Sequence, residues 1–167
     1  VPCYINQGDK SYADDGKQLI REDFYRNLPS MRPHPTTAAP SPGDCTKAIE
    51  SAAADADHVV VVAVATKLSG TYNALRLGAA NLPPEKVTLI DSQNTTMGLG
   101  WPVVIGAEIA EATGDIEKTV EAVKNVRQHT HVYAGLETME FLRRSGRVGW
   151  AAAGLGALLQ IKPVLHV

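Results

Sequence analysis

Residues 58–65 are the feature of the sequence that most constrains the fold. They form a continuous run rich in valine, HVVVVAVA, without the alternation of polar residues that marks a half-exposed strand. Such a run is typical of a strand in a parallel sheet, because both faces of that sheet are covered by helices. A loop at residues 66–70 and a helical segment at about residues 71–80 follow it. The sequence therefore predicts a strand, a loop and a helix in the middle of the chain.

The rest of the chain continues this alternation. Strands are expected at residues 1–12, with a turn at residues 6–9, at residues 87–90 and 131–134, and from residue 164. Helices are expected at residues 21–28, 42–54, 95–112, 116–128, 137–144 and 150–159, and a proline-rich loop at residues 29–43. Ser41 before Pro42 is typical of a helix start, and Gly114 of a helix end. The pattern predicts the α/β class, with a mostly parallel sheet and helices on both faces.

Composition and charge argue against several kinds of partner. The chain has 16 basic and 18 acidic residues and a formal net charge of -2, so it lacks the basic surface that holds nucleic acid. The longest apolar run, residues 59–65, is far shorter than the roughly 20 residues of a membrane-spanning helix. Cys3 and Cys45 form neither a metal motif nor a disulfide scaffold, and the histidines show no metal-ligand spacing. We therefore expect no metal, no nucleic acid and no membrane span.

Two loops are candidates for ligand binding, because ligands of open α/β sheets bind beyond the carboxyl ends of the strands. The first contains Ser69, Gly70 and Thr71, directly before a helix whose first N–H groups could receive an anion. The second contains Thr36 and Thr37, held in a loop stiffened by proline. Hydroxyl residues near helix starts are also ordinary caps, so the spacing alone leaves both interpretations open.

Other polar residues give weaker signals. Arg143, Arg144 and Arg147 around a glycine could recognise an anion or a partner protein, or could form a solvated helix end. Asp91 ends a strand and could be catalytic, but no base or nucleophile can be assigned to it. The chain also lacks the phosphate-binding, dinucleotide-binding and hydrolase motifs that would indicate an enzyme. These observations weakly favour a binding protein.

Several short motifs stand in a fixed order along nearly the whole chain. They are YADDG at residues 12–16, EDFY at 22–25, PTTAAPSP at 35–42, KLSGTY at 67–72, IDS at 90–92, MGLG at 97–100, LRRSGRV at 142–148 and LQIKPVL at 159–165. Taken together, these motifs resemble the DegV family of bacterial fatty-acid-binding proteins. Single motifs are short, but their joint order makes the resemblance specific.

The resemblance implies a carrier that is not itself an enzyme. Family members have two α/β domains with a long-chain fatty acid buried between them. They present this acid to an ATP-dependent fatty acid kinase, which phosphorylates it to an acyl phosphate for phospholipid synthesis. We expect a carrier of this kind to be cytoplasmic. Carried over to this chain, Thr37 and Ser69 would hold the carboxylate, with Thr36 and Gly70 nearby. Arg144 or Arg147 would serve the encounter with the kinase, and no cofactor other than the bound acid is implied.

The resemblance also implies domain boundaries, and the chain departs from the family pattern at one place. Residues 1–130 correspond to a first α/β domain without its N-terminal strand, and residues 131–167 to the beginning of a second, truncated domain. Ala38 and Ala39 replace a Ser-Gln pair of the family, which removes a polar group near the carboxylate. Two other interpretations remain open. One is a small-molecule hydrolase or transferase that uses Ser69 or Asp91, and the other is a truncated domain that no longer binds ligand.

Overall fold

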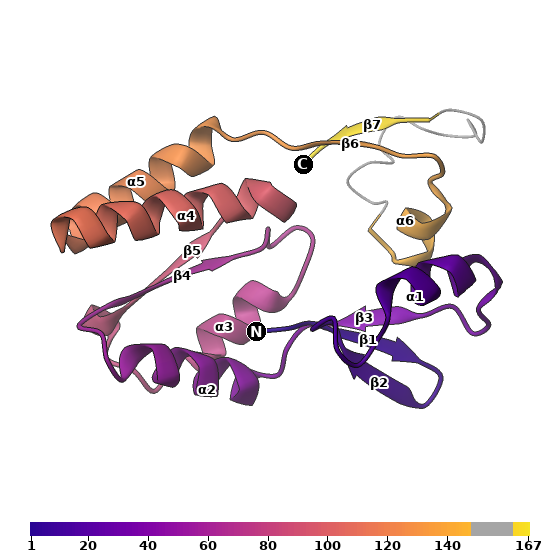
Figure 1. Ribbon diagram of the computed structural model, residues 1–167, viewed down its shortest axis with the longest axis horizontal. Coiled ribbons are helices and arrows are strands. Elements are labelled where there is room, and N and C mark those ends of the chain that lie inside the picture. Colours follow the sequence, from indigo (N-terminus) through magenta and orange to yellow (C-terminus); the bar gives the residue numbers. More distant parts are fainter. Residues whose placement is uncertain (148–161) are drawn as a thin grey trace. The chain divides into compact units, whose positions relative to one another are not determined.

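The computed structural model describes residues 1–147 and 162–167 (Figure 1). Its strands are β1 (Tyr4–Gln7), β2 (Lys10–Ala13), β3 (Thr36–Ala38), β4 (Val59–Ala63), β5 (Val87–Asp91), β6 (Tyr133–Gly135) and β7 (Val164–His166). Its helices are α1 (Arg21–Asn27), α2 (Pro42–Ala53), α3 (Thr71–Gly78), α4 (Thr96–Thr113), α5 (Ile116–His129) and α6 (Glu140–Arg144), with short 3-10 turns at Leu28–Ser30 and Pro84–Lys86. The α/β class is confirmed, whereas the helix expected at residues 150–159 lies outside the described residues.

The chain divides into two compact units. The first contains Val1–Val61 and Ser69–Leu89, and the second contains Val62–Leu68 and Ile90–Val167. Strands β4 and β5 therefore begin in the first unit and end in the second. The expected domain boundary at residue 130 stays a prediction, and each unit is described by itself below.

The first unit contains an antiparallel sheet in the order β2-β1-β3. A tight turn joins β1 to β2, and Gly8 adopts the left-handed backbone that this turn requires, with φ of 59°. β3 pairs with β1, and Ile5 stands opposite Thr37. The expectation that residues 29–43 form only a loop is wrong for β3, because pairing with a distant strand decides its conformation.

Helices α2 and α3 pack against each other in the same unit. Ser41 caps α2, since its hydroxyl accepts a hydrogen bond from the Asp44 backbone N–H at 3.1 Å, and this confirms the predicted helix start. The two helices approach closely at Gly78, where an added Cβ would lie 2.6 Å from the Cβ of Cys45. Cys45 and Ile49 of α2 are buried in this contact region together with Leu75 of α3.

Strands β4 and β5 form the parallel pair of the α/β fold. Ser92 N–H donates to the Ala63 carbonyl, and Ala65 N–H donates to the Asn94 carbonyl, each at 2.9 Å. These bonds advance in the same direction along both strands, as in a parallel ladder. The valines of β4 are half-buried, whereas Ala63 at its end is only 2% exposed. The carboxyl ends of the two strands thus lie together in the second unit.

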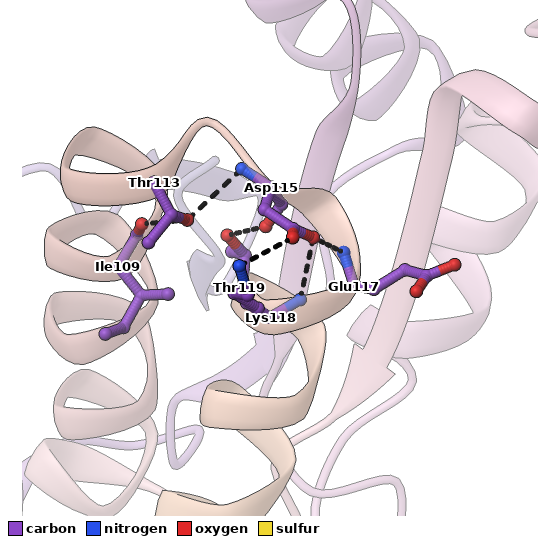
Figure 2. A network of polar contacts seen from close by, with 6 residues as sticks. All are labelled: Ile109, Thr113, Asp115, Glu117, Lys118 and Thr119. Atoms are coloured by element: carbon purple, nitrogen blue, oxygen red, sulfur yellow. Dashed lines mark hydrogen bonds and ion pairs between the residues drawn. The ribbon is translucent and has the colours of Figure 1, made fainter.

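The second unit contains the hairpin of α4 and α5 and the antiparallel pair of β6 and β7. Gly114 ends α4 with φ of 61°, as predicted from its position, and Asp115 caps α5 (Figure 2). The helices meet closely at Gly106, where a Cβ would lie 2.5 Å from Val123. Within residues 1–147 and 162–167, no helix is both long enough and apolar enough to cross a membrane.

Candidate functional site

Ser69 and Thr71 form a hydroxyl pair at the start of α3 in the first unit. Their hydroxyl oxygens share a hydrogen bond of 2.8 Å, and the Thr71 backbone N–H donates to Ser69 Oγ at 3.3 Å. Gly70 is the N-cap of α3, and Ser69 directly before it accepts the free N–H of the first helical residue. A hydroxyl has one donor and two acceptor positions, so Ser69 retains its own proton for a ligand when Thr71 donates to it. The pair can therefore both satisfy a helix N–H and donate to an anion.

Gly70 leaves open space beside this pair. Its φ is -74°, an ordinary value, so backbone conformation does not require glycine. A Cβ built on Gly70 meets no heavy atom within 4 Å, and the residue is exposed. A ligand group can therefore approach the backbone here without displacing a described side chain.

Thr37 lies on the sheet face that carries Ile5, two residues after Cys3. Thr37 stands opposite Ile5, and residues two apart on a strand point to the same face. The ladder continues to Cys3, whose carbonyl accepts the Asp14 N–H at 2.9 Å. Cys3 Sγ in turn lies 3.8 Å from Thr71 Oγ1. The hydroxyl pair of α3 thus contacts the residue directly before β1, the strand that pairs with Thr37.

Thr36 is placed differently from its neighbour. It stands opposite Asn6, and strand alternation puts it on the other sheet face. That face carries Tyr4, whose hydroxyl donates to Asp44 Oδ2 at 3.2 Å. Thr36 and Thr37 therefore form a matched pair of threonines on opposite faces of one strand.

The second unit contains a pocket of about 450 Å³ at the carboxyl ends of three strands. Residues 65–68 after β4 line it, together with Asp91 and Gln93 of the β5 end and His166 and Val167 of the β7 end. Ligands of parallel α/β folds bind at such strand ends, which is where the sequence predicted a site. The predicted loop at residues 66–71 thus contributes its first half to this pocket.

Asp91 has a structural role in this pocket. Its Oδ2 accepts hydrogen bonds from the Thr66 hydroxyl at 2.8 Å and the Thr66 backbone N–H at 3.4 Å. Its Oδ1 accepts from the Gln93 backbone N–H at 2.8 Å, and Gln93 has the left-handed φ of 56°. Each carboxylate oxygen accepts a hydrogen bond from a loop, so Asp91 holds two loop segments in place. This arrangement gives no support to Asp91 as a general base.

Arg147, one of the arginines in the motif at residues 142–148, contacts a residue that lines this pocket. Arg147 Nε donates to the Leu68 carbonyl at 2.8 Å, which places its positive charge against a pocket-lining residue. Arg144 forms an ion pair with Glu140 on α6. Arg144 and Arg147 therefore have different described contacts, although the sequence analysis made them equivalent candidates. Val148 and residues 159–161 of the motifs lie outside the described residues.

Sequence reasoning missed a histidine pair at the pocket. His166 Nε2 lies 3.3 Å from His131 Nδ1, and Tyr133 stacks on His166 with ring centroids 4.8 Å apart. The pairing of β6 with β7 brings these residues together across more than thirty positions, so no local spacing could reveal it. Among the described residues, no group of three or more His, Cys, Asp or Glu side chains could hold a metal ion.

Cys45 is excluded as a nucleophile by its surroundings. The residue is fully buried against α3, and this burial raises the pKa of its thiol. A raised pKa lowers the fraction of thiolate, which is the reactive form. Cys45 therefore belongs to the packing of the first unit.

The sequence also matches the model of a known protein family. The model of a family described as "Uncharacterised protein, DegV family" matches residues 1–167. The chain belongs to the DegV family. A DegV domain-containing protein of Deinococcus radiodurans is 34% identical over 167 residues, which are 100% of this chain and 59% of that protein. The chain therefore spans about six-tenths of the length of this curated relative.

Solved structures of other DegV proteins share the fold. A DegV-family protein of Thermus thermophilus, described as fatty acid binding, is 33% identical with a TM-score of 0.88, and the match covers 100% of this chain and 59% of that one. A DegV-family protein of Ruminococcus gnavus, refined with vaccenic acid, is 25% identical with a TM-score of 0.83, and the match covers 99% and 59%. The motifs PTTAAPSP and KLSGTY of this DegV protein are those that contain Thr37 and Ser69.

Proposed function

We propose that this DegV protein binds a long-chain fatty acid and holds its carboxylate with the hydroxyls of Thr37 and Ser69. The observation that carries the proposal is the contact of Thr71, the partner of Ser69, with Cys3, the residue directly before the strand that pairs with Thr37. The fatty acids of the Thermus and Ruminococcus relatives support the choice of ligand. Because the chain spans 59% of these relatives, fatty-acid binding is a proposal for this chain.

The energetics of such a site favour a ligand that is mostly hydrocarbon. A hydrogen bond to a charged group contributes about 1.5–3 kcal/mol, so two hydroxyls orient the carboxylate and supply part of the affinity. Burying the tail contributes about 0.8 kcal/mol for each CH₂ before the cost of association. The tail therefore supplies most of the affinity and the hydroxyls select the acid group.

The protein is proposed to act as a carrier. The relatives are described by the acids that they bind, and each oxygen of Asp91, the alternative catalytic residue, accepts a hydrogen bond within the protein. The finer proposal, which rests on the family resemblance, is that this carrier is cytoplasmic, that a fatty acid kinase phosphorylates the bound acid and that Arg144 or Arg147 meets that kinase. Replacing each arginine with alanine and measuring acyl phosphate formation by such a kinase tests this step. Formation unchanged in both variants contradicts it.

Mass spectrometry tests the proposed ligand directly. The 167-residue chain is purified, and an organic extract is searched for long-chain acids. The proposal predicts a long-chain acid in the extract in a fixed ratio to protein, or saturable uptake of added oleate by the emptied chain. Absence of both contradicts it.

A further inference from the structure

We infer that α4 carries a self-association surface, on which a second copy of this chain packs its own α4 in the antiparallel direction. The surface consists of Met97, Trp101 and Val104. It lies within the second unit and includes neither Thr37 nor Ser69, so it goes beyond the fatty-acid proposal.

One face of α4 is packed and another is exposed. Gly98, Pro102 and Gly106 are buried, and Gly106 meets Val123 of α5 closely. The three residues of the self-association surface recur at i, i+4 and i+7, so they form one stripe along the helix. Their exposed fractions are 52%, 51% and 41% in chain order. An exposed stripe of large apolar side chains marks an interaction site, and tryptophan is enriched in protein interfaces.

The charges of α4 indicate what covers this stripe. Glu108 and Glu111 continue it toward the C-terminal end of the helix, where negative charge is unfavourable. Neither enters the ion pairs found among the described residues. The N-terminal end has no acidic residue in its first turn, and the Thr95 side chain makes no capping hydrogen bond. Each end of α4 therefore lacks the charge that would stabilise it.

A second α4 in the antiparallel direction corrects both ends at once. When Trp101 packs on Val104 of the second copy, the seven-residue repeat of the stripe places Glu108 and Glu111 beside the N-terminal turn of the facing helix. The apolar residues of both stripes then cover each other. A parallel pairing would instead bring Glu108 and Glu111 against their own copies, and like charges repel.

A lipid surface suits this stripe less well. Helices that bind in a membrane interface carry lysine and arginine on their polar face, whereas α4 contains neither. The charges of α4 therefore favour a second copy of the chain over a membrane.

Sedimentation equilibrium of the 167-residue chain tests this inference. Three half-exposed side chains supply less than the roughly 800 Å² that each partner buries in a stable interface, so self-association should be weak. We expect the average mass to rise with protein concentration between about 10 µM and about 1 mM. Trp101→Glu and Val104→Glu should each weaken self-association about five-fold or more, because each places a charge inside the interface. Leu77→Glu is the matched control, since Leu77 of α3 is a 46% exposed leucine outside the surface.

Acid variants test the antiparallel direction. Glu108→Gln combined with Glu111→Gln should weaken self-association about two-fold or more, because the carboxylates stabilise the N-terminal turn of the facing helix. Tighter association of this double variant would indicate a parallel pair and overturn the inference.

A chain that stays monomeric at all these concentrations overturns the inference, as does equal weakening by Trp101→Glu and Leu77→Glu. Trp101-dependent binding to phosphatidylcholine vesicles by a chain that does not self-associate also overturns it, since this assigns the stripe to a lipid surface. Fatty-acid content is measured on the same samples, so failure here is distinguishable from failure of the carrier proposal.

Discussion

The Thr66 hydroxyl donates a hydrogen bond of 2.8 Å to Asp91 Oδ2, which ties the chain after β4 to the end of β5. The same carboxylate accepts the Gln93 N–H through Oδ1. One side chain thus fixes both strand-end segments that line the pocket of the second unit. Its hydrogen bonds thus position the backbone of both segments.

Replacing Asp91 with alanine should destabilise the protein. The change removes the acceptors of Thr66 and Gln93, and because these hydrogen bonds are exposed, each lost bond should cost about 0.5–1.5 kcal/mol in free energy of unfolding. Thr66→Val, which keeps the backbone bond and removes only the hydroxyl, should cost less. Denaturant unfolding of the two variants measures the difference. An Asp91→Ala protein as stable as wild type contradicts the positioning role.

Replacing Gly78 with alanine should also destabilise the protein, because α2 leaves no room for a methyl group. The added Cβ would lie 2.6 Å from Cys45 Cβ and 2.8 Å from the Thr46 backbone nitrogen, and backbone cannot yield easily. Overpacking of this kind costs about 1–3 kcal/mol. Gly43→Ala in α2 is the control, since its nearest neighbour is the Ser41 hydroxyl at 3.8 Å. Equal melting temperatures of the two variants would contradict the close packing of α2 against α3 at Gly78.

The cap of α5 should make stability depend on acid pH. Lys118 lowers the pKa of Asp115, first through its backbone N–H and then through its side chain, and the Glu117 N–H adds to this (Figure 2). Because the pKa of Asp115 is lower in the folded protein than in the unfolded chain, its ionised form stabilises the fold. This contribution is complete above the ordinary aspartate pKa of about 3.9, and it is lost as the pH falls through the lowered value. As the pH is lowered below about 4, the melting temperature of wild type should therefore decrease more steeply than that of Asp115→Asn. Parallel pH profiles of the two proteins contradict this account.

Local signals predicted the parts of the fold that local chemistry decides. The Ser41 cap and the left-handed Gly114 follow from backbone groups within a few residues, so their positions could be derived from sequence alone. The valine-rich run predicted β4 for the same reason. Strand β3 could not be predicted, because Thr36–Ala38 is extended through pairing with a strand some thirty residues earlier.

In the candidate site, too, local features could be predicted from the sequence, whereas contacts between distant residues could not. Ser69 was found through its place before a helix, and its hydroxyl lies where that reasoning put it. Which sheet face Thr36 and Thr37 each occupy depends on their register with β1, which the sequence does not specify. The meeting of Arg147 with Leu68 and of His166 with His131 depends on packing between distant segments. The sequence therefore proposes candidate residues, whereas the contacts between distant candidates require the fold.

Palmitate titration of four proteins tests the central claim most directly. These are wild type, Thr36→Ala, Thr37→Ala and the double variant Thr37→Ala with Ser69→Ala, all followed by calorimetry. The account predicts that wild type and Thr36→Ala bind palmitate with similar affinity, because Thr36 lies on the other sheet face. Thr37→Ala should bind several-fold more weakly and the double variant more weakly still, since each hydroxyl donates to the carboxylate. Failure of wild type to bind palmitate, or equal affinity of wild type and the double variant, would contradict the account.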